Sequence, residues 1–457
     1  MKKNQVITLE IIDLTNLGFG VGRYEGQVVF VSDAVTGDTV KARIIKVGSS
    51  YSVARVEEYL KKSALRVNDR CSNSLCKSCA YKAISYKEEC LLKEESVRQI
   101  FKKAELSNLK IVPVVGSPLL REYRNKAQYP ISKSKSGEYS IGFFAPKSHR
   151  VTEAADCPLA PTIFAEINET LRIFFKENSL SVYDVETGEG LLRHIYLRRG
   201  EVSREVLLTL VINGDSIPGS DELVKKITER FPSVVGILIN KNKKETNVIL
   251  GDEYVTLFGR DYIFDTLSGV KLKISAQSFY QVNHGATENL YAKAKELCQL
   301  NGNELVLDLY CGLGSIGLSM AKNCREVIGI EIVESAVECA RENARNNGIN
   351  NASFYVGDAS EARKLLLNAE SKRNEAIKPD IIILDPPRAG STPELIEYAA
   401  ELNPQRIVYI SCNPSTLARD MKEFKKLGYL GDEVFLYDLF AATGHVESLV
   451  CLQKQTN

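Results

Sequence analysis

The fold of this 457-residue chain is decided by the stretch Leu305-Val-Leu-Asp-Leu-Tyr-Cys-Gly-Leu-Gly-Ser-Ile-Gly317. Its first five residues form an apolar run of the length of a buried strand, and glycines follow at 312, 314 and 317. Closely spaced glycines let the backbone turn from a strand into a helix whose first amides face a bound ligand. The stretch therefore predicts a strand, a ligand-binding loop and a helix.

The chain beyond residue 275 repeats this alternation of strand and helix. Helices are predicted at Val333–Asn346 and Pro393–Leu402, between short apolar strands at Leu305–Leu309, Glu326–Ile330, Ser353–Val356, Asp380–Leu384 and Arg406–Ile410. Such alternation is typical of an α/β fold with a doubly wound parallel sheet, here expected over 271–457. Two further strands, Tyr429–Leu439 and Glu447–Gln453, follow without a helix, so an antiparallel pair should end the sheet.

Two other domains are expected before this one. Five short alternating strands broken by turn residues fill residues 1–60 and favour a small closed barrel of the oligonucleotide-binding kind, although such a barrel can also serve only as a structural cap. Residues 61–270 are expected to form a central α+β domain. It should hold a long basic helix near Ile84–Ala104, a hairpin of Tyr123–Ile131 and Tyr139–Phe144, and a helix at Pro161–Asn178.

The net charge of +1 hides a strong asymmetry along the chain. Residues 61–150 carry nineteen Lys and Arg against eight Asp and Glu, whereas residues 1–60 carry seven of each. A concentrated positive field suits a polyphosphate partner, because neutralising phosphates releases bound counterions. No apolar signal segment or stretch of membrane-spanning length is apparent, so we expect a cytoplasmic protein without membrane contact.

Eleven cysteines in a reducing compartment indicate metal binding and catalysis before disulfides. Cys71, Cys76 and Cys79 are spaced closely enough for three ligands of one site, and Cys157 is the natural fourth, with Cys90 as a substitute. Four thiolates suit zinc or an iron–sulfur cluster, and spacing does not decide between them. The remaining cysteines 298, 311, 324, 339 and 451 are interpreted as packing residues.

The glycine loop alone fits two cofactor classes. A nicotinamide-binding domain shows the same glycines, with an acid such as Glu331 one strand later. The later strand ends favour S-adenosylmethionine, because Asp385-Pro386-Pro387-Arg388 and Ser411-Cys412-Asn413-Pro414 have no use in a dehydrogenase. We then expect Asp308, Gly312 and Gly314 near the methionine part, Glu331 at the ribose and Asp358 at the adenine.

Cys412 stands where a predicted strand ends and a helix begins. Asn413 is a capping residue and Pro414 suits the first helical position, so backbone amides should point at the sulfur. A helix N-terminus favours the thiolate. Cys412 is therefore a candidate nucleophile, although most free cysteines are packing residues.

Together these motifs resemble the RNA uracil carbon-5 methyltransferases, specifically the bacterial ribosomal 5-methyluridine enzymes with a TRAM barrel and an iron–sulfur cluster. The resemblance covers nearly the whole chain. It is carried by the barrel strands, the cysteine quartet, Gln277–Asn283, the glycine loop, the Asp385–Arg388 and Ser411–Pro414 elements, and His445-Val446-Glu447-Ser448.

The resemblance implies a class I methyltransferase domain and an activity on carbon 5 of a uridine in 23S ribosomal RNA. Cys412 would be the nucleophile, Glu447 the base, and Asp385 a group that binds the uracil edge or orients the thiol. Gln281, Tyr310, Glu331 and Asp385 would line the cofactor and uracil pocket. The four cysteines would hold a [4Fe-4S] cluster. No obligate protein partner is implied.

Two other functions fit parts of the sequence. A cytosine carbon-5 methylase also needs a thiol, but the Glu447 proton acceptor and the setting of Cys412 favour uracil. An RNA-binding assembly factor could keep the fold without turnover, and the paired presence of Cys412 and Glu447 argues against it.

Overall fold

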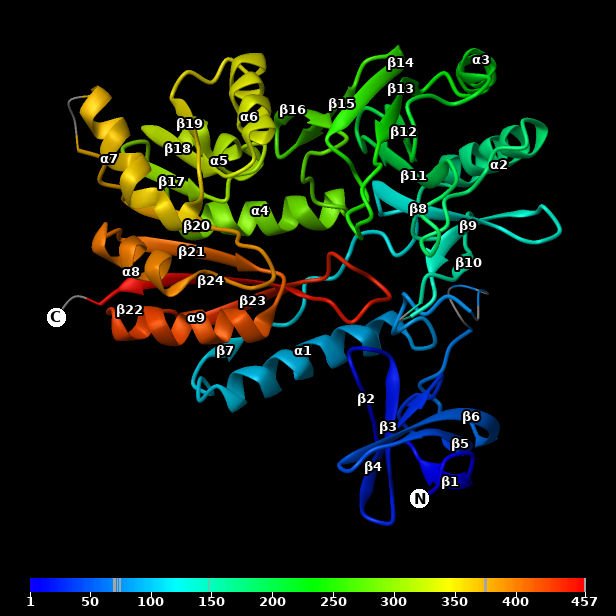
Figure 1. The fold of residues 1–457 in the computed structure, drawn as a ribbon. Helices are drawn as coiled ribbons and strands as arrows, with labels where there is room; N and C mark the ends of the chain where they lie inside the picture. The colour runs from blue at the N-terminus through cyan, green and yellow to red at the C-terminus, as the bar shows by residue number, and fades with distance from the viewer. Residues whose placement is uncertain (69–70, 72, 74, 147, 374–375, 456–457) are drawn as a thin grey trace.

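The computed structural model describes residues 1–68, 71, 73, 75–146, 148–373 and 376–455. Figure 1 shows an N-terminal barrel at one corner, a central α+β body and a C-terminal α/β body. The α/β architecture with a small β-domain and a mixed middle region is the one predicted.

The barrel is one strongly bent sheet. Its strands are β1 (Val6–Glu10), β2 (Asp13–Leu14), β3 (Phe19–Tyr24), β4 (Gln27–Ser32), β5 (Thr39–Val47) and β6 (Tyr51–Lys61). Their order in the sheet is β1-β5-β6-β4-β3-β2. The Ile12 amide donates to the Val21 carbonyl at 2.8 Å, which brings the first strand against β3. Alternate residues such as Ile7, Leu9 and Val40 fill the interior, as the period of a half-buried strand requires.

The central body is a sheet in the order β10-β9-β8-β11-β12-β13-β14. The hairpin predicted before residue 145 is present as β8 (Lys126–Lys133) and β9 (Tyr139–Phe144), followed by β10 (Val151–Glu153). The remaining elements are α2 (Thr162–Glu177), β11 (Leu192–Arg199), β12 (Val206–Ile212), α3 (Ser220–Arg230), β13 (Val234–Lys241) and β14 (Glu253–Gly259). A separate hairpin, β15 (Tyr262–Leu267) and β16 (Val270–Ser275), leads into the next body.

The C-terminal sheet has the order β19-β18-β17-β20-β21-β24-β23-β7. Its parallel strands are β17 (Leu305–Leu309), β18 (Glu326–Glu331), β19 (Ala352–Val356), β20 (Ile381–Leu384) and β21 (Arg406–Ser411). β23 (Glu433–Tyr437) and β24 (Glu447–Lys454) form the predicted antiparallel end, and β22 (Tyr429–Leu430) pairs with β24. The sheet is covered by α4 (His284–Cys298), α5 (Ser315–Met320), α6 (Glu334–Asn346), α7 (Ala362–Arg373), α8 (Pro393–Glu401) and α9 (Pro414–Lys426).

Part of the middle stretch belongs structurally to this C-terminal sheet. Helix α1 (Tyr86–Lys103) packs Val97 and Phe101 into its core, and β7 (Lys110–Ile111) pairs in parallel with β23. The predicted helix is present. Its five Lys and Arg only slightly outnumber its four Glu, with Glu88 and Glu89 in the first turn and Lys93 buried. In the described part of the chain, no helix is both long and apolar enough to cross a bilayer.

Candidate active site at the carboxyl ends of the parallel strands

The strand order has a topological switch point between β17 and β20, and the edge of the sheet at the carboxyl ends of these strands is named here the strand-end crevice. From β17 the chain builds outward through β18 and β19 on one side, and later through β20 and β21 on the other. Ligands of open α/β sheets bind at such a switch point, outside the carboxyl ends of the strands. Tyr310, Glu331, Asp385 and Cys412 each lie at or just after the carboxyl end of a strand there.

The glycine loop is tied to the next strand by Glu331. One carboxylate oxygen of Glu331 accepts the Gly312 amide at 3.0 Å, and the other accepts the Val333 amide at 2.9 Å. Gly312 and Gly314 have φ values of 54° and 81°, and Gly314 precedes α5. These glycines are needed because residues with a Cβ rarely adopt this conformation. The loop is thus fixed in a tight turn before ligand arrives.

Asp308 supports the glycine loop. It is fully buried, and its Oδ2 accepts the Gly317 amide at 3.0 Å. Its Oδ1 has no hydrogen-bond partner among the described residues. Burial raises the pKa of Asp308 to about 7, although the Gly317 amide opposes the rise. The expected contact of Asp308 with the methionine part of the cofactor stays a prediction.

Three other expected cofactor residues have the following local surroundings. Tyr310 holds a φ of 68°, a disfavoured region for a residue with a Cβ, and such strain is concentrated at functional sites. Asp358 follows β19 and accepts the Ser360 amide at 2.8 Å, and its hydrogen bonds to Ser360 lower its pKa. Gln281 is nearly buried, with its carbonyl held by the Asn125 side chain at 2.8 Å.

Cys412 begins the turn from β21 into α9, as predicted. The Asn413 side chain caps the helix by accepting the Ser415 amide at 3.1 Å. Its Nδ2 donates to the Arg388 carbonyl at 3.1 Å, so the loops that follow β20 and β21 are joined.

The pairing of β21 with β24 brings Cys412 and Glu447 together. Ser411 is the register partner of Ser448, so Cys412 and Glu447 lie one step further along the same antiparallel pair. Opposed residues of such a pair point to the same face of the sheet. The thiol and the carboxyl are thus neighbours, and the charge of Glu447 accordingly raises the pKa of Cys412.

The ionisation of Cys412 differs from the prediction. The pKa of the thiol is raised to about 11. Burial is the main cause, the charges of Glu447 and Asp385 add to it, and Arg388 opposes the rise. Desolvation and two acidic neighbours outweigh the favourable helix start. The thiol is therefore protonated at neutral pH in the free protein, and a base must take its proton.

Two carboxyls at the site have pKa values near neutrality. Burial raises the pKa of Asp385 to about 7. The pKa of Glu447 is raised to about 8. Burial is the main cause, the charge of Asp385 adds to it, and Arg388 opposes the rise. Titratable groups tuned toward the working pH are typical of acid–base catalysis.

The four predicted metal ligands line one cavity, apart from the strand-end crevice. Cys71, Cys76, Cys79 and Cys157 border a space of about 560 Å³ together with Arg124. Among the described residues, no group of three or more His, Cys, Asp or Glu side chains is arranged to hold a single metal ion. The thiols share a cavity without converging on one point.

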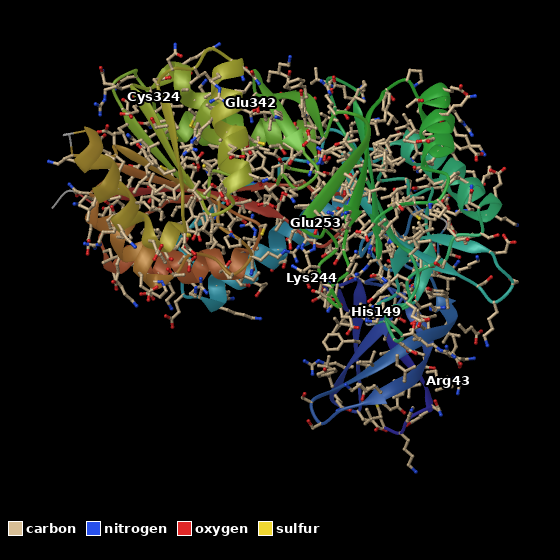
Figure 2. All side chains as sticks on the ribbon, turned by 45° about the horizontal axis from the view of Figure 1, so that its top comes forward. Arg43, His149, Lys244, Glu253, Cys324 and Glu342 are labelled. Atoms are coloured by element: carbon tan, nitrogen blue, oxygen red, sulfur yellow. The ribbon has the colours of Figure 1, made fainter. Side chains whose placement is uncertain are left out.

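The remaining cysteines include the expected packing residues. Cys298, Cys311, Cys324 and Cys339 are buried, and Cys451 is half-buried. Figure 2 shows Cys324 near Glu342 at the end of the molecule opposite to Arg43 of the barrel. These positions leave Cys412 as the partly exposed thiol at the strand-end crevice.

Sequence reasoning missed Tyr291 of α4. Its hydroxyl lies 3.0 Å from the Ser315 Oγ at the start of α5, and burial together with Asp385, Asp308 and Glu447 raises its pKa. A tyrosine at helical spacing carries no sequence signal for such a position. The effect of Arg388 on both Cys412 and Glu447 was also not predicted.

A model of the tRNA (uracil-5-)-methyltransferase family matches residues 220–455, more than half of the chain. The chain belongs to this family. A TRAM-domain model matches residues 2–56, which is the barrel. This uracil-5-methyltransferase chain is 37% identical to an RNA methyltransferase of Clostridium acetobutylicum, over 99% of this chain and 98% of the relative. It is also 37% identical to an RNA methyltransferase of Staphylococcus aureus, with 98% of each covered.

A solved structure agrees with this assignment. The crystal structure of the Pyrococcus abyssi tRNA (uracil-54, C5)-methyltransferase, in complex with S-adenosyl-L-homocysteine, superposes with a TM-score of 0.77 and 27% identity. It covers 98% of this chain and 100% of that one. The predicted class I methyltransferase fold and the membership in an S-adenosylmethionine-dependent RNA methyltransferase family are thereby confirmed.

Proposed function

We propose that this protein methylates carbon 5 of a uridine in 23S ribosomal RNA, using S-adenosylmethionine and a temporary covalent bond from Cys412 to carbon 6 of the uracil. The observation that carries the proposal is the β21–β24 register, which sets a thiol opposite a buried carboxyl beside the glycine loop. Carbon 5 of uracil is a weak nucleophile, and covalent catalysis divides one hard step into easier ones.

Each residue then has a defined part in the reaction. The Asp385 carboxylate takes the thiol proton, so that Glu447 stays ionised for the later step, and the Cys412 sulfur forms a bond to carbon 6. The electron pair of the 5,6 double bond becomes an enolate. The bound cofactor supplies a sulfonium methyl group, which carbon 5 accepts while S-adenosylhomocysteine leaves. Glu447 removes the carbon 5 proton, the double bond reforms, and the carbon 6–sulfur bond breaks to release Cys412.

The cofactor fits the strand-end crevice. Glu331 and Asp358 would hold the ribose and adenine, and Gly312 leaves room beside the loop, with no heavy atom within 4 Å of a Cβ built on it. Gly314 is needed instead for packing, because a Cβ there would lie 3.1 Å from Leu318 and Phe354. Gln281, Tyr310 and Asp385 complete the proposed pocket for cofactor and uracil. A uracil in folded RNA must leave its stack to reach Cys412.

All four thiols line one cavity of about 560 Å³. Four thiolates suit zinc or an iron–sulfur cluster, and the resemblance to the cluster-bearing enzymes leads us to propose a [4Fe-4S] cluster. We assign it a structural role, which fixes the basic segment for RNA contact. Its thiols fit a cytoplasmic location.

One experiment tests the function. Purified protein is mixed with S-adenosylmethionine and 5-fluorouridine-containing 23S ribosomal RNA or transfer RNA. A denaturation-resistant adduct with the ribosomal RNA, absent in Cys412→Ala, is expected. An adduct with transfer RNA alone would move the substrate to that class, as in the Pyrococcus abyssi enzyme. No adduct with either RNA would refute the nucleophile and favour a binding role.

A further inference from the structure

The candidate base is reached through a loop that leaves the C-terminal sheet. The β23–β24 loop, Asp438–Val446, begins after Tyr437 and ends at Glu447. Figure 1 shows it extending from the sheet towards α1 and the barrel. Glu447 is the first residue of β24 and the register partner of Tyr437, so the loop joins directly onto the strand end that carries it.

A buried lysine holds the start of this loop. Lys93 of α1 is 1% exposed, and its Nζ lies 2.8 Å from Glu89 Oε1 and 2.7 Å from Asp438 Oδ1. The same ammonium donates to the Phe440 carbonyl at 3.3 Å. Glu89 and Asp438 are fully buried as well, so three charges lie inside the protein at this point.

Further hydrogen bonds fix the middle of the loop. Glu89 Oε1 also accepts the Ala442 amide at 2.7 Å, and the Ala442 carbonyl accepts the Tyr81 amide at 2.9 Å. The Tyr123 hydroxyl donates to the Ala441 carbonyl at 2.9 Å. These partners come from the segment that follows the barrel, far from the loop in the sequence.

The barrel touches the end of the loop. A Cβ on Gly444 would lie 1.8 Å from the backbone oxygen of Asn16 and 2.6 Å from its carbonyl carbon. Asn16 belongs to the turn between β2 and β3. Gly444 is therefore required by this close approach, three residues before Glu447.

These contacts do more than hold the protein together. A buried ion pair contributes little net stability, because desolvation offsets its Coulomb attraction. Ala442 has a φ of 71°, a conformation that is unfavourable for a residue with a Cβ. Such a backbone persists only where its surroundings impose it. The contacts thus define one conformation of the loop.

We propose that Lys93 is a positioning residue, which through Glu89 and Asp438 holds the β23–β24 loop so that Glu447 faces Cys412. The inference rests on the proposed function, because it assigns the loop a part in the proton-removal step. The barrel and the α1 segment, which we propose to contact RNA, both hold this loop. The same contacts therefore position the proposed base.

Two variants test this from opposite sides of the loop. Lys93→Met combined with Glu89→Gln removes two buried charges and keeps an acceptor for the Ala442 amide. Gly444→Ala leaves the charges intact and forces a methyl group against Asn16. Matched controls are Lys176→Met, which loses only an exposed ion pair with Glu138, and Gly269→Ala in a hairpin turn away from the loop. At a φ of 78° and with no heavy atom within 4 Å of the new Cβ, Gly269→Ala adds local backbone strain without a contact and so controls for destabilisation alone.

The readout is the ratio of covalent adduct to released methylated RNA, with natural uridine and S-adenosylmethionine. A misplaced base slows elimination after methyl transfer, so both loop variants should raise this ratio about tenfold, as Glu447→Gln does, while both controls match the wild type. A parallel fall of adduct and product in folded variants would overturn the inference. If Lys93→Met/Glu89→Gln does not fold, Gly444→Ala alone decides. A wild type that forms no adduct with fluorouridine RNA would refute the proposed function itself, and this inference with it.

Discussion

Ser411 and Ser448 are register partners at the end of the β21–β24 pair, and this pairing sets Cys412 opposite Glu447. The proposed nucleophile and the proposed base, 35 residues apart in the sequence, thus lie at the same end of neighbouring strands. The reaction needs both groups on one ring, at carbon 6 and at the proton of carbon 5. An antiparallel strand added to a parallel sheet supplies that arrangement with the backbone alone.

Replacing Cys412 by alanine should abolish methylation and leave the fold intact. The thiol is partly exposed and lies outside the hydrophobic core, so the thermal midpoint should change by less than about 2 °C. The loss of the nucleophile should lower kcat/KM by about 10⁴-fold or more. Residual activity within tenfold of the wild type would contradict covalent catalysis.

Glu447→Gln should allow one methyl transfer and then stall. The amide cannot accept the carbon 5 proton, so methylated RNA should remain bound to Cys412 and be seen as a slower band on denaturing gels. Glu288→Gln, at an exposed position on α4, is the control. Normal turnover of Glu447→Gln would remove this residue from the proposed mechanism.

Activity should rise with pH between about 6 and 8. The pKa of Asp385 is raised to about 7 and that of Glu447 to about 8, in both cases chiefly by burial. Proton acceptance requires the ionised form, so the rate should fall as these groups become protonated. Single-turnover rates across this range measure the effect, and a flat profile would exclude both carboxyls as proton acceptors.

The same shift predicts a stability change. Because the pKa of Glu447 is higher in the folded protein than in the unfolded chain, its effect on stability is absent at low pH and becomes unfavourable as the pH rises from about 4.5 to 8. Glu447→Gln should therefore increase the free energy of unfolding at pH 8 by on the order of 2 kcal/mol, with no gain at pH 4. Denaturant titrations at both pH values check the sign.

Gly317→Ala should weaken cofactor binding. The new Cβ would lie 2.8 Å from Val327 Cγ1 and 3.0 Å from Asp308 Oδ2, which pushes α5 away from the strand and disturbs the glycine loop. Calorimetry should show at least about a tenfold loss of affinity for S-adenosylhomocysteine. Gly302→Ala, where no heavy atom lies within 4 Å of the Cβ, should bind normally.

The cysteine cavity predicts iron. Purified under anaerobic conditions, the protein should contain iron and acid-labile sulfide in equal amounts, with absorbance near 400 nm (roughly the region of thiolate-ligated clusters). Cys79→Ser should lose most of the iron, whereas Cys324→Ser should keep it. Stoichiometric zinc without iron would overturn the cluster proposal.

The sequence predicted the parallel strands to within one or two residues, because Leu305–Leu309 and its successors are fully buried and bounded by turn residues. The position of Cys412 followed from the capping signal of Asn413-Pro414. The buried network of Lys93 could not be foreseen, because an interior lysine resembles any other lysine of an amphipathic helix. The high pKa of Cys412 also depends on Glu447 and Asp385, which only folding brings near.

Strand β7 gives the molecule a property beyond catalysis. Because Lys110–Ile111 extends the edge of the C-terminal sheet beside β23, a fragment beginning near residue 271 would leave that edge and the apolar contacts of Val97 and Phe101 uncovered. Unsatisfied sheet edges recruit other chains. The methyltransferase half is therefore not expected to fold as an independent domain. Gene fusions or truncations that discard the preceding segment should yield aggregates.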